Sequence, residues 1–302
     1  MISLLQRSWL LMIQRRRVVF GGIAAVALVC VLLQIVMEQR IGAEVSIQLQ
    51  RLLGDQRYQQ IMTELQTQTG QSDPQTVIQT VADEAAKKID SLSPADQSAF
   101  LTTLVRESLP ILSVVAFLLL LYFLISIWIR GYFFQIALIP GADFRELVAR
   151  TTGSYFRFLG AIFATFFASC IWLPILLLPA LATPFFPLFF LSVLLPFFLV
   201  PRLSLSPFLV LKGEKIRRSI GESFRRSRGS YWKIVITLFL SALCAGVVAV
   251  FLTLILSALM SLSPPSILFF FAWMREIIAL LSVAFVTMTL ALLSQEILGR
   301  KS

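Results

Sequence analysis

Residues 159–200 read LGAIFATFFASCIWLPILLLPALATPFFPLFFLSVLLPFFLV, a run of 42 residues without a single Asp, Glu, Lys or Arg. A helix needs about 20 apolar residues to cross the roughly 30 Å hydrocarbon core of a bilayer, where no water satisfies free backbone groups. The run is therefore twice as long as one span requires, and Thr183-Pro184 interrupts it near its centre. We predict a tight hairpin of two membrane-spanning helices, 159–182 and 184–200.

The composition of the whole chain agrees with a membrane protein. Of the 302 residues, 58% are hydrophobic and 14% are charged, and the mean hydropathy is +0.85. This balance excludes a soluble enzyme. Four further apolar runs reach the length of a span, at 18–37, 109–129, 234–260 and 277–295. The predicted fold is all-α, a polytopic membrane protein with six transmembrane helices, cytoplasmic interfacial amphipathic helices and a small helical extracytoplasmic cap.

The residue types that common active sites need are missing or misplaced. The chain has no histidine, which excludes His-based triads, imidazole metal sites and His proton relays. Cys30, Cys170 and Cys244 fall within predicted spans, where each serves as a small apolar residue. The six apolar cores hold no ionisable side chain of the kind that marks ion paths, and no Gly-rich phosphate loop is present. We expect no enzymatic activity, no cofactor, no metal site and no disulfide.

Lys and Arg are distributed unequally between the two sides of the predicted spans. With both termini in the cytoplasm, the inside segments hold 19 of the 26 Lys and Arg but 5 of the 16 Asp and Glu. The inside face then carries +14 and the outside face −4, as the positive-inside rule requires. The first apolar run is longer than the roughly 7–15 residues of a signal peptide, so we expect a retained anchor. We predict a multi-pass protein of the bacterial inner (plasma) membrane with cytoplasmic N- and C-termini.

Residues 38–108 form the one substantial polar segment, rich in Gln and net negative. Apolar residues recur at helical spacing over 41–53 and again over 58–65. Asp73-Pro74 and Ser93-Pro94 each place a capping residue before a proline, which marks two further helix starts. We expect an extracytoplasmic cap of four short helices that packs on itself or on the outer ends of the spans, docks a protein partner or self-associates. The predicted divisions are a cytoplasmic amphipathic helix 1–17, transmembrane helix 18–37, the cap 38–108 and a five-span domain 109–302.

Two of the predicted cytoplasmic loops share one sequence plan. FRELVARTTGSYFRF (144–158) aligns with IGESFRRSRGSYWKI (220–234) at a constant offset of 76. Glu146 meets Glu222, and Arg150 meets Arg226, and Gly-Ser-Tyr recurs before each span. The repeat predicts interfacial helices at 143–152 and 212–228, after which a glycine lets the chain turn into the membrane.

Each repeated unit is predicted to lie in the headgroup plane. Ile216, Ile220 and Phe224 fall one helical turn apart and form an apolar stripe, while arginines crowd the rest of the helix. The N-terminus resembles a third copy, with an apolar stripe of Leu5, Trp9, Met12 and Ile13. An amphipathic anchor and a binding surface for acidic headgroups or an acidic partner are both consistent with this pattern. The predicted lipid or partner contacts are Arg217, Arg218, Arg225, Arg226, Arg228, Tyr231, Trp232, Lys233, Arg150, Tyr155 and Arg157.

A family resemblance involves the second of these loops. The loop contains Arg202 with the following Leu-Ser-Leu-Ser-Pro-Phe, then Gly213, Ile220, Ser223-Phe224 and Gly229 through Trp232. This pattern resembles the cytoplasmic loop of the six-helix bacterial membrane domain that some glycerophosphodiester phosphodiesterases carry. It also resembles that loop in related YciC-like inner-membrane proteins. The motifs cover about 40 residues, and topology extends the resemblance over 130–300. The resemblance implies a membrane module without the catalytic phosphodiesterase domain. The Gln-rich segment 38–108 departs from the family pattern.

Two functions fit these patterns. The first is a non-enzymatic scaffold that interacts with membrane lipids through anionic headgroups, or with a protein. The alternative is a permease or lipid translocase with a cavity near the Pro-broken spans, since Pro174, Pro179, Pro184, Pro187 and Pro196 free backbone carbonyls that need partners. No nucleic-acid partner is expected, because the positive charge lies near span ends and no nucleic-acid fold pattern accompanies it.

Overall fold

The computed structural model describes residues 2–56, 59–60, 63, 87, 89, 93–139, 141–171, 186–261 and 267–299. Within these ranges every regular element is a helix, which confirms the all-α prediction. The chain divides into two compact units, one of Met1–Val31 with Leu124–Ser302 and one of Leu32–Phe123. Two long helices, α2 (Arg16–Leu53) and α5 (Pro94–Leu138), contribute residues to both units.

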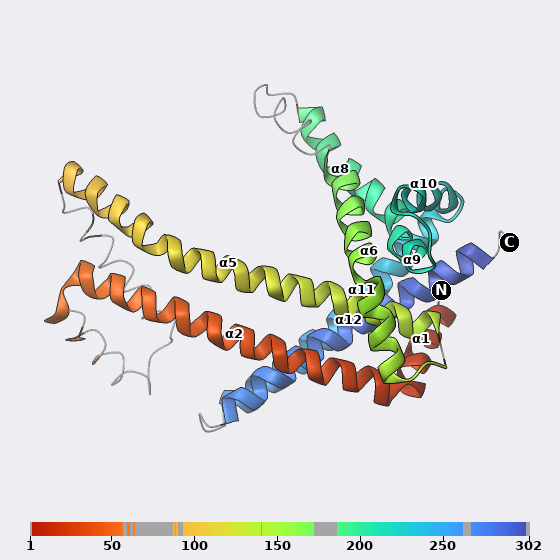
Figure 1. Ribbon diagram of the computed structural model, residues 1–302, viewed down its shortest axis with the longest axis horizontal. Coiled ribbons are helices and arrows are strands. Elements are labelled where there is room, and N and C mark those ends of the chain that lie inside the picture. Colours follow the sequence, from red (N-terminus) through yellow and green to blue (C-terminus); the bar gives the residue numbers. More distant parts are fainter. Residues whose placement is uncertain are drawn as a thin grey trace. The chain divides into compact units, whose positions relative to one another are not determined.

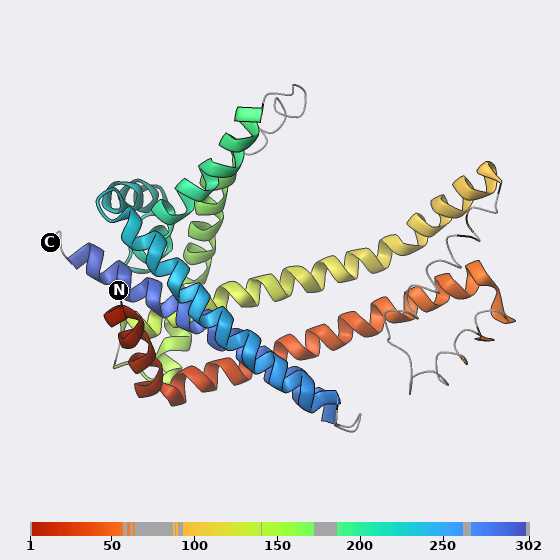
Figure 2. The same ribbon diagram turned by 180° about the vertical axis from the view of Figure 1, so that it is seen from behind.

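The remaining helices all belong to the first unit and are seen in Figures 1 and 2. They are α1 (Ile2–Gln14), α6 (Phe144–Cys170), α8 (Phe186–Leu203), α9 (Ser206–Leu211), α10 (Ile216–Ser227), α11 (Tyr231–Ser261) and α12 (Leu268–Gly299). The short α9 packs against α6 and α10, α10 also packs against α6 and α8, and α11 lies alongside α12.

In the described part of the chain, five helical segments are long and apolar enough to cross a membrane. They are Arg16–Ala43, Leu112–Leu138, Leu194–Leu211, Tyr231–Met260 and Phe269–Gly299. Each overlaps one of the predicted spans, so the chain has the character of a membrane protein. The predicted span 159–182 is described only as far as Ile171, and the predicted turn at Thr183-Pro184 lies outside the described residues, as do Pro174 and Pro179. The total of six spans therefore stays a prediction.

The core of the first unit is built around the last turns of α5. Tyr132, Phe133 and Ile136 are fully buried, and they pack with apolar side chains of α2, α6 and α12. Residues 131–137 are buried on every side of the helix, which explains why this stretch lacks an amphipathic pattern. The core therefore gathers around one helix end that neighbours enclose.

One glycine permits the closest approach in this core. A Cβ atom at Gly22 would lie 2.6 Å from Cε1 of Tyr132, whereas one at Gly21 would meet only Phe144, at 4.0 Å. The Tyr132 hydroxyl donates a hydrogen bond to the Val18 carbonyl at 2.9 Å, one turn away on α2. The missing side chain at Gly22 thus lets the tyrosine ring lie directly on the α2 backbone.

The surface of α11 is typical of a helix that faces lipid. Phe239, Val247, Phe251 and Leu254 are each at least 60% exposed. The opposite side carries buried Ser241 and Ala245, and the Ser282 hydroxyl of α12 reaches the Ala245 carbonyl at 3.5 Å. Small residues at the contact let two apolar helices approach, while large ones cover the outer side.

The second unit differs from the predicted cap at both of its described ends. A separate helix was predicted over 41–53, but α2 continues without a break from the apolar run to Leu53. The predicted start at Ser93-Pro94 is confirmed, because α5 begins at Pro94 and the Asp96 amide donates to the Ser93 hydroxyl at 3.2 Å. That helix then continues through Pro110 into the membrane segment. The two other predicted helices, over 58–65 and after Asp73-Pro74, lie almost entirely outside the described residues.

Candidate functional site

The two sequence repeats share one structural feature, an ion pair between residues four positions apart. Arg150 Nη2 lies 2.8 Å from Glu146 Oε1, and Arg226 Nε lies 2.9 Å from Glu222 Oε2. In each copy the glutamate precedes the arginine by one helical turn, the orientation that agrees with the helix dipole. The internal repeat is therefore a repeat of structure at this position.

After the ion pair the two copies differ. In the second copy α10 ends at Ser227, residues 228–230 form a turn, and α11 begins at Tyr231. In the first copy the expected turn at Gly153 is absent, because α6 continues from Phe144 to Cys170. The predicted interfacial helix at 143–152 is thus the first part of a longer helix, and only α10 is a separate one.

The inward face of α10 is a row of serines, and Ile216 and Ile220 of the predicted apolar stripe are partly buried beside it. Ser219, Ser223 and Ser227 are fully buried, whereas Phe224 is 40% exposed. Ser219 and Ser206 share a hydrogen bond of 2.8 Å, and the Ser223 hydroxyl donates to the Arg202 carbonyl at 2.7 Å. Small side chains allow α10 to approach α8 and α9 closely, and their hydroxyls find acceptors within that contact.

The N-terminal helix α1 also packs through a serine. Its buried residues are Leu4, Ser8 and Met12, while Trp9 and Ile13 of the predicted stripe are 57% and 48% exposed. The Thr289 hydroxyl of α12 donates to the Ser8 hydroxyl at 2.9 Å. Both amphipathic helices therefore use a buried serine for packing and leave apolar side chains uncovered on the outside.

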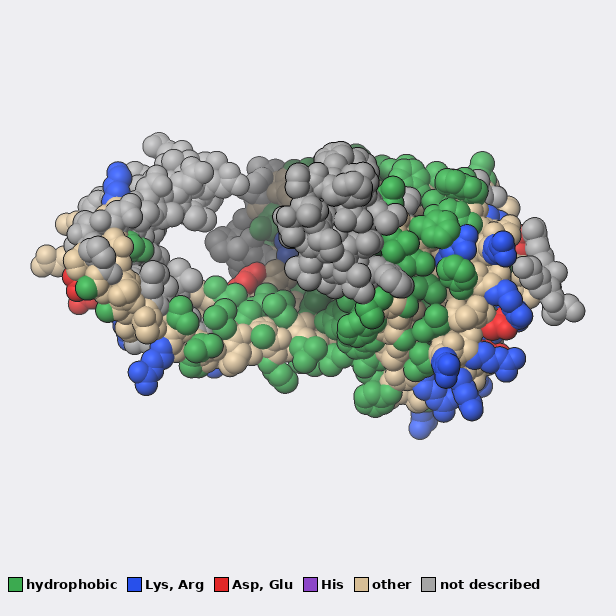
Figure 3. Space-filling view, turned by 90° about the horizontal axis from the view of Figure 1, so that it is seen from above, with side chains coloured by type: hydrophobic (Ala, Val, Ile, Leu, Met, Phe, Trp, Pro, Cys, Tyr) green, Lys and Arg blue, Asp and Glu red, His purple; other side chains and the backbone are tan. Residues whose placement is uncertain are grey.

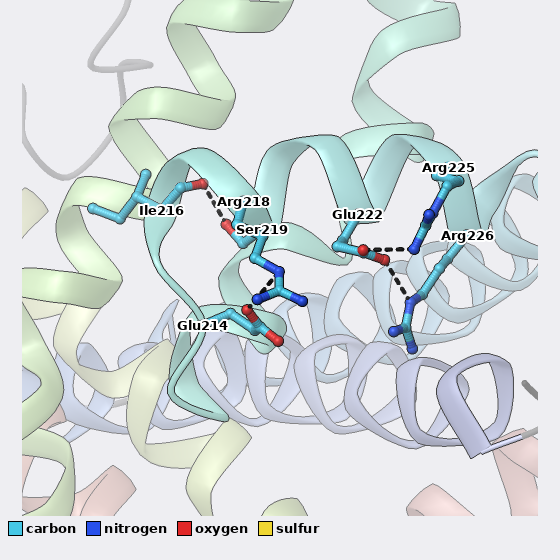
Figure 4. A network of polar contacts seen from close by, with 7 residues as sticks. All are labelled: Glu214, Ile216, Arg218, Ser219, Glu222, Arg225 and Arg226. Carbon is cyan, nitrogen blue, oxygen red and sulfur yellow. Dashed lines mark hydrogen bonds and ion pairs between the residues drawn. The ribbon is translucent and has the colours of Figure 1, made fainter. Parts of the chain in front are cut away.

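The outward face of α10 carries the predicted arginines, some of which share carboxylates (Figure 4). Arg225 and Arg226 both donate to Glu222, at 2.6 and 2.9 Å, and Arg218 lies 3.5 Å from Glu214. These hydrogen bonds, that of Arg226 first and that of Arg225 second, hold the pKa of Glu222 below its usual range. Neither Arg217 nor Arg228 has an ion-pair partner in the described part of the chain.

Positive charge accordingly exceeds negative charge on this surface. The five arginines of 217–228 outnumber the carboxylates Glu214 and Glu222 by three, and Lys215 adds a further positive charge. Figure 3 shows Lys and Arg side chains gathered at the end of the first unit that carries α10, next to a hydrophobic surface. Cationic side chains next to an exposed apolar surface are typical of the part of a membrane protein that lies at the level of the lipid headgroups.

Arg202, which was not among the predicted contacts, joins three helices through aromatic rings. Its guanidinium carbon lies 4.2 Å from the ring centre of Phe198, 4.7 Å from that of Phe224 and 5.6 Å from that of Tyr231. Its Nε atom is buried and has no hydrogen-bond partner in the described part of the chain. Arg202, Phe224 and Tyr231, which are among the residues that carry the family resemblance, thus form a packing cluster with Phe198. In the sequence, the signal for this contact was the spacing of Phe198 and Arg202 by one helical turn.

A polar pocket lies between the ends of α5 and α9 and the first half of α6. It has a volume of about 400 Å³. Predicted residues Arg150 and Arg157 line it, together with polar residues that no sequence pattern groups with them. The full lining is Gln135, Leu138, Ile139, Arg150, Gly153, Ser154, Arg157, Leu211 and Lys212.

The three other predicted contact residues take different positions. The Tyr155 hydroxyl donates to the Leu124 carbonyl at 3.0 Å, so it holds α6 to α5. Trp232 is 70% exposed and packs its edge on Tyr231. Lys233 donates to Glu296 at 2.6 Å and joins α11 to α12. Of these three, Trp232 is the residue whose side chain is largely uncovered.

Among the described residues, no three or more Asp, Glu, Cys or His side chains come together as a metal site would require. Comparison of the chain with family models, with curated proteins and with solved structures finds no match in any of the three. Guanidinium, ammonium and amide groups that face open space can hold an anion.

Proposed function

We propose that this chain is a non-enzymatic protein of the bacterial inner membrane that serves as an interaction scaffold, with anionic lipid headgroups bound at its cytoplasmic face. The observation that carries the proposal is the surplus of arginine on α10 and the turn that follows it, beside helices apolar enough to cross the membrane. A protein partner with an acidic surface is the other occupant of the same face, and it forms an outcome of the test.

The position of the cations along the helices supports this proposal. Arg157 is followed by 44 residues without a charge, since the next charged residue is Arg202. Arg228 lies in the turn that leads into the apolar α11. Basic residues near an anionic membrane surface contribute about 1 kcal/mol each. A surplus of three such residues is therefore sufficient to select anionic over zwitterionic lipids.

The orientation within the proposal follows from charge and from the family resemblance. The segments that hold most of the Lys and Arg are short and flank the spans, which is the arrangement of cytoplasmic loops. The loop that resembles the six-helix bacterial membrane domain is one of them. We therefore assign α10 to the cytoplasmic side and 38–108 to the opposite side.

Lipid retention tests this function. The full-length protein is purified in mild detergent, and the anionic and zwitterionic lipids that remain bound are measured by mass spectrometry. Replacing Arg217, Arg218, Arg225, Arg226 and Arg228 with Gln is expected to lower the ratio of anionic to zwitterionic lipid several-fold. The control replaces the cations Arg40 and Arg106 of the opposite segment with Gln and is expected to leave the ratio unchanged.

Two results would contradict the proposal. An unchanged ratio in the five-fold variant would show that the arginines of α10 do not select lipid. Loss of a co-purifying acidic protein, with lipid unchanged, would assign the face to that partner instead.

A further inference from the structure

We infer that the pocket between α5, α6 and α9 is a discrete site for one phosphate-ester group, of the kind that an anionic lipid headgroup carries. This inference deepens the proposed function, because it needs the basic face to lie at headgroup depth. It concerns a different set of side chains, however, from the arginines of α10.

One face of α6 forms the floor of the pocket. Arg150, Gly153, Ser154 and Arg157 follow the spacing i, i+3, i+4 and i+7, so they lie in one row along the helix. The two arginines stand about 10 Å apart along the axis at a rise of about 1.5 Å per residue. Gly153 and Ser154, in the middle of the row, have small side chains and therefore leave the space that forms the pocket. A Cβ added at Gly153 would have no neighbour within 4 Å.

The charges of the pocket leave two cations available. Arg150 is paired with Glu146 at 2.8 Å. Arg157 and Lys212 have no carboxylate partner in the described part of the chain, and Lys212 Nζ lies 5.1 Å from the ring centre of Phe208. A surplus of two positive charges matches a phosphate ester and repels the ammonium group of a zwitterionic headgroup.

A buried amide adds a directed polar group. Gln135 is 5% exposed and lines the pocket, although its neighbours Phe134 and Ile136 are packed in the apolar core. Its Nε2 atom reaches the Ser154 hydroxyl at 3.5 Å, the outer limit of a hydrogen bond. Ser154 itself already donates to the Arg150 carbonyl at 2.8 Å. A buried amide normally makes several hydrogen bonds, and the Nε2 atom of Gln135 carries two N–H groups. Gln135 can therefore donate a further hydrogen bond to an oxygen atom of a ligand.

Each wall of the pocket lies where an apolar stretch of its helix begins or ends. The membrane-length segment of α5 ends at Leu138, and Lys212 directly follows the segment Leu194–Leu211. On α6, Arg157 comes directly before the charge-free run that begins with Phe158. Three helices that leave the hydrocarbon at one place put the pocket at the depth where lipid phosphates lie.

Native mass spectrometry of the full-length protein in detergent tests the site by counting bound ligands. The probes are short-chain phosphatidylglycerol, short-chain phosphatidylcholine and glycerol 3-phosphate. We expect one saturable phosphatidylglycerol per chain and at least tenfold weaker binding of phosphatidylcholine. Equal binding of glycerol 3-phosphate and phosphatidylglycerol would identify a soluble phosphate ester as the ligand and overturn the lipid as its source, while binding of neither would overturn the site.

Three variants separate this site from diffuse attraction. Arg157→Gln and Lys212→Gln remove its charges, and Gly153→Met fills its floor without any change of charge. Each is expected to weaken the saturable binding at least tenfold. The matched control is Gly221→Met on α10, where an added side chain also enters open space. An effect of the charge variants without an effect of Gly153→Met would assign binding to the surface field and overturn the site.

The outcomes distinguish this inference from the function on which it rests. If the five-fold α10 variant loses anionic lipid while the pocket variants bind normally, the scaffold function stands and the pocket assignment is wrong. If neither set of variants changes lipid binding, both are wrong. Thermal unfolding of each variant checks that the pocket substitutions leave the protein folded.

Discussion

Lys233 donates a hydrogen bond to Glu296 across 2.6 Å, and this contact joins the first turn of α11 to the last turns of α12. Its counterpart in the first repeat, Arg157, faces a pocket and has no carboxylate partner in the described part of the chain. Equivalent positions of the repeat have therefore diverged, one toward a contact between helices and the other toward an open polar site.

The first prediction concerns this divergence. Lys233→Gln is expected to lower thermal stability, because it removes the ion pair between the partly buried Lys233 and Glu296, at a cost of about 1 kcal/mol. Arg157→Gln is expected to leave stability nearly unchanged. Thermal unfolding in detergent measures both. Equal melting temperatures for Lys233→Gln and the wild type would show that the contact does not stabilise the helix pair.

The second prediction concerns the close approach of Tyr132 to α2. Gly22→Ala is expected to lower the melting temperature by several degrees, because its Cβ would lie 2.6 Å from a buried ring in a close-packed core. Gly21→Ala is the matched control on the same helix, where the nearest atom is 4.0 Å away. If both variants have the same melting temperature as the wild type, Tyr132 does not pack closely on Gly22.

The third prediction concerns charge on α10. Glu222→Gln removes the negative charge and one of the two oxygens to which Arg225 and Arg226 donate, so both guanidinium groups become more available to other anions. Retention of anionic lipid by the purified protein is expected to rise, in contrast to its fall when the arginines are replaced. Ser230→Gln, in the turn that follows α10, is the control for a new glutamine at this surface. A fall in retention for Glu222→Gln would contradict the proposed role of the arginines.

The fourth prediction gives the pH dependence of the same contact. Because hydrogen bonds from Arg226 and Arg225 lower the folded-state pKa of Glu222, its contribution to stability is fully present above the usual glutamate pKa of 4.5. That contribution is lost as the pH falls through the lowered pKa. The difference in unfolding free energy between the wild type and Glu222→Gln should therefore be constant from pH 7 to 6 and shrink below pH 4.5. A difference that grows as the pH falls would refute the assigned direction.

Apolar run length predicted the helical class and the segments of membrane length, because the bilayer requires internal backbone hydrogen bonding over a fixed distance. Ser93-Pro94 likewise predicted a helix start, since a cap is a local interaction. The inward face of α10 could not be predicted in this way. Periodicity locates apolar residues, but beside a membrane an apolar stripe can face lipid while serines such as Ser219 face the protein.

The pocket was beyond sequence reasoning for a different reason. Arg150 and Arg157 were among the predicted contacts, but Gln135 and Lys212 lie 77 residues apart and meet only through packing of α5, α6 and α9. The end of α2 was also misplaced, since a helix need not stop where its apolar run stops. Helix α2 continues past Met37 because hydrogen bonding within the backbone is independent of side-chain polarity.

The central claim, that the basic α10 surface and the segment 38–108 lie on opposite sides of one membrane, is tested most directly by thiol labelling. Single cysteines at Ser98 and at Lys215, both exposed, are introduced after Cys30, Cys170 and Cys244 are replaced by Ala. A membrane-impermeant maleimide applied to intact spheroplasts should label Ser98→Cys and should label Lys215→Cys only after the membrane is opened. Labelling of both positions from the same side would contradict the account.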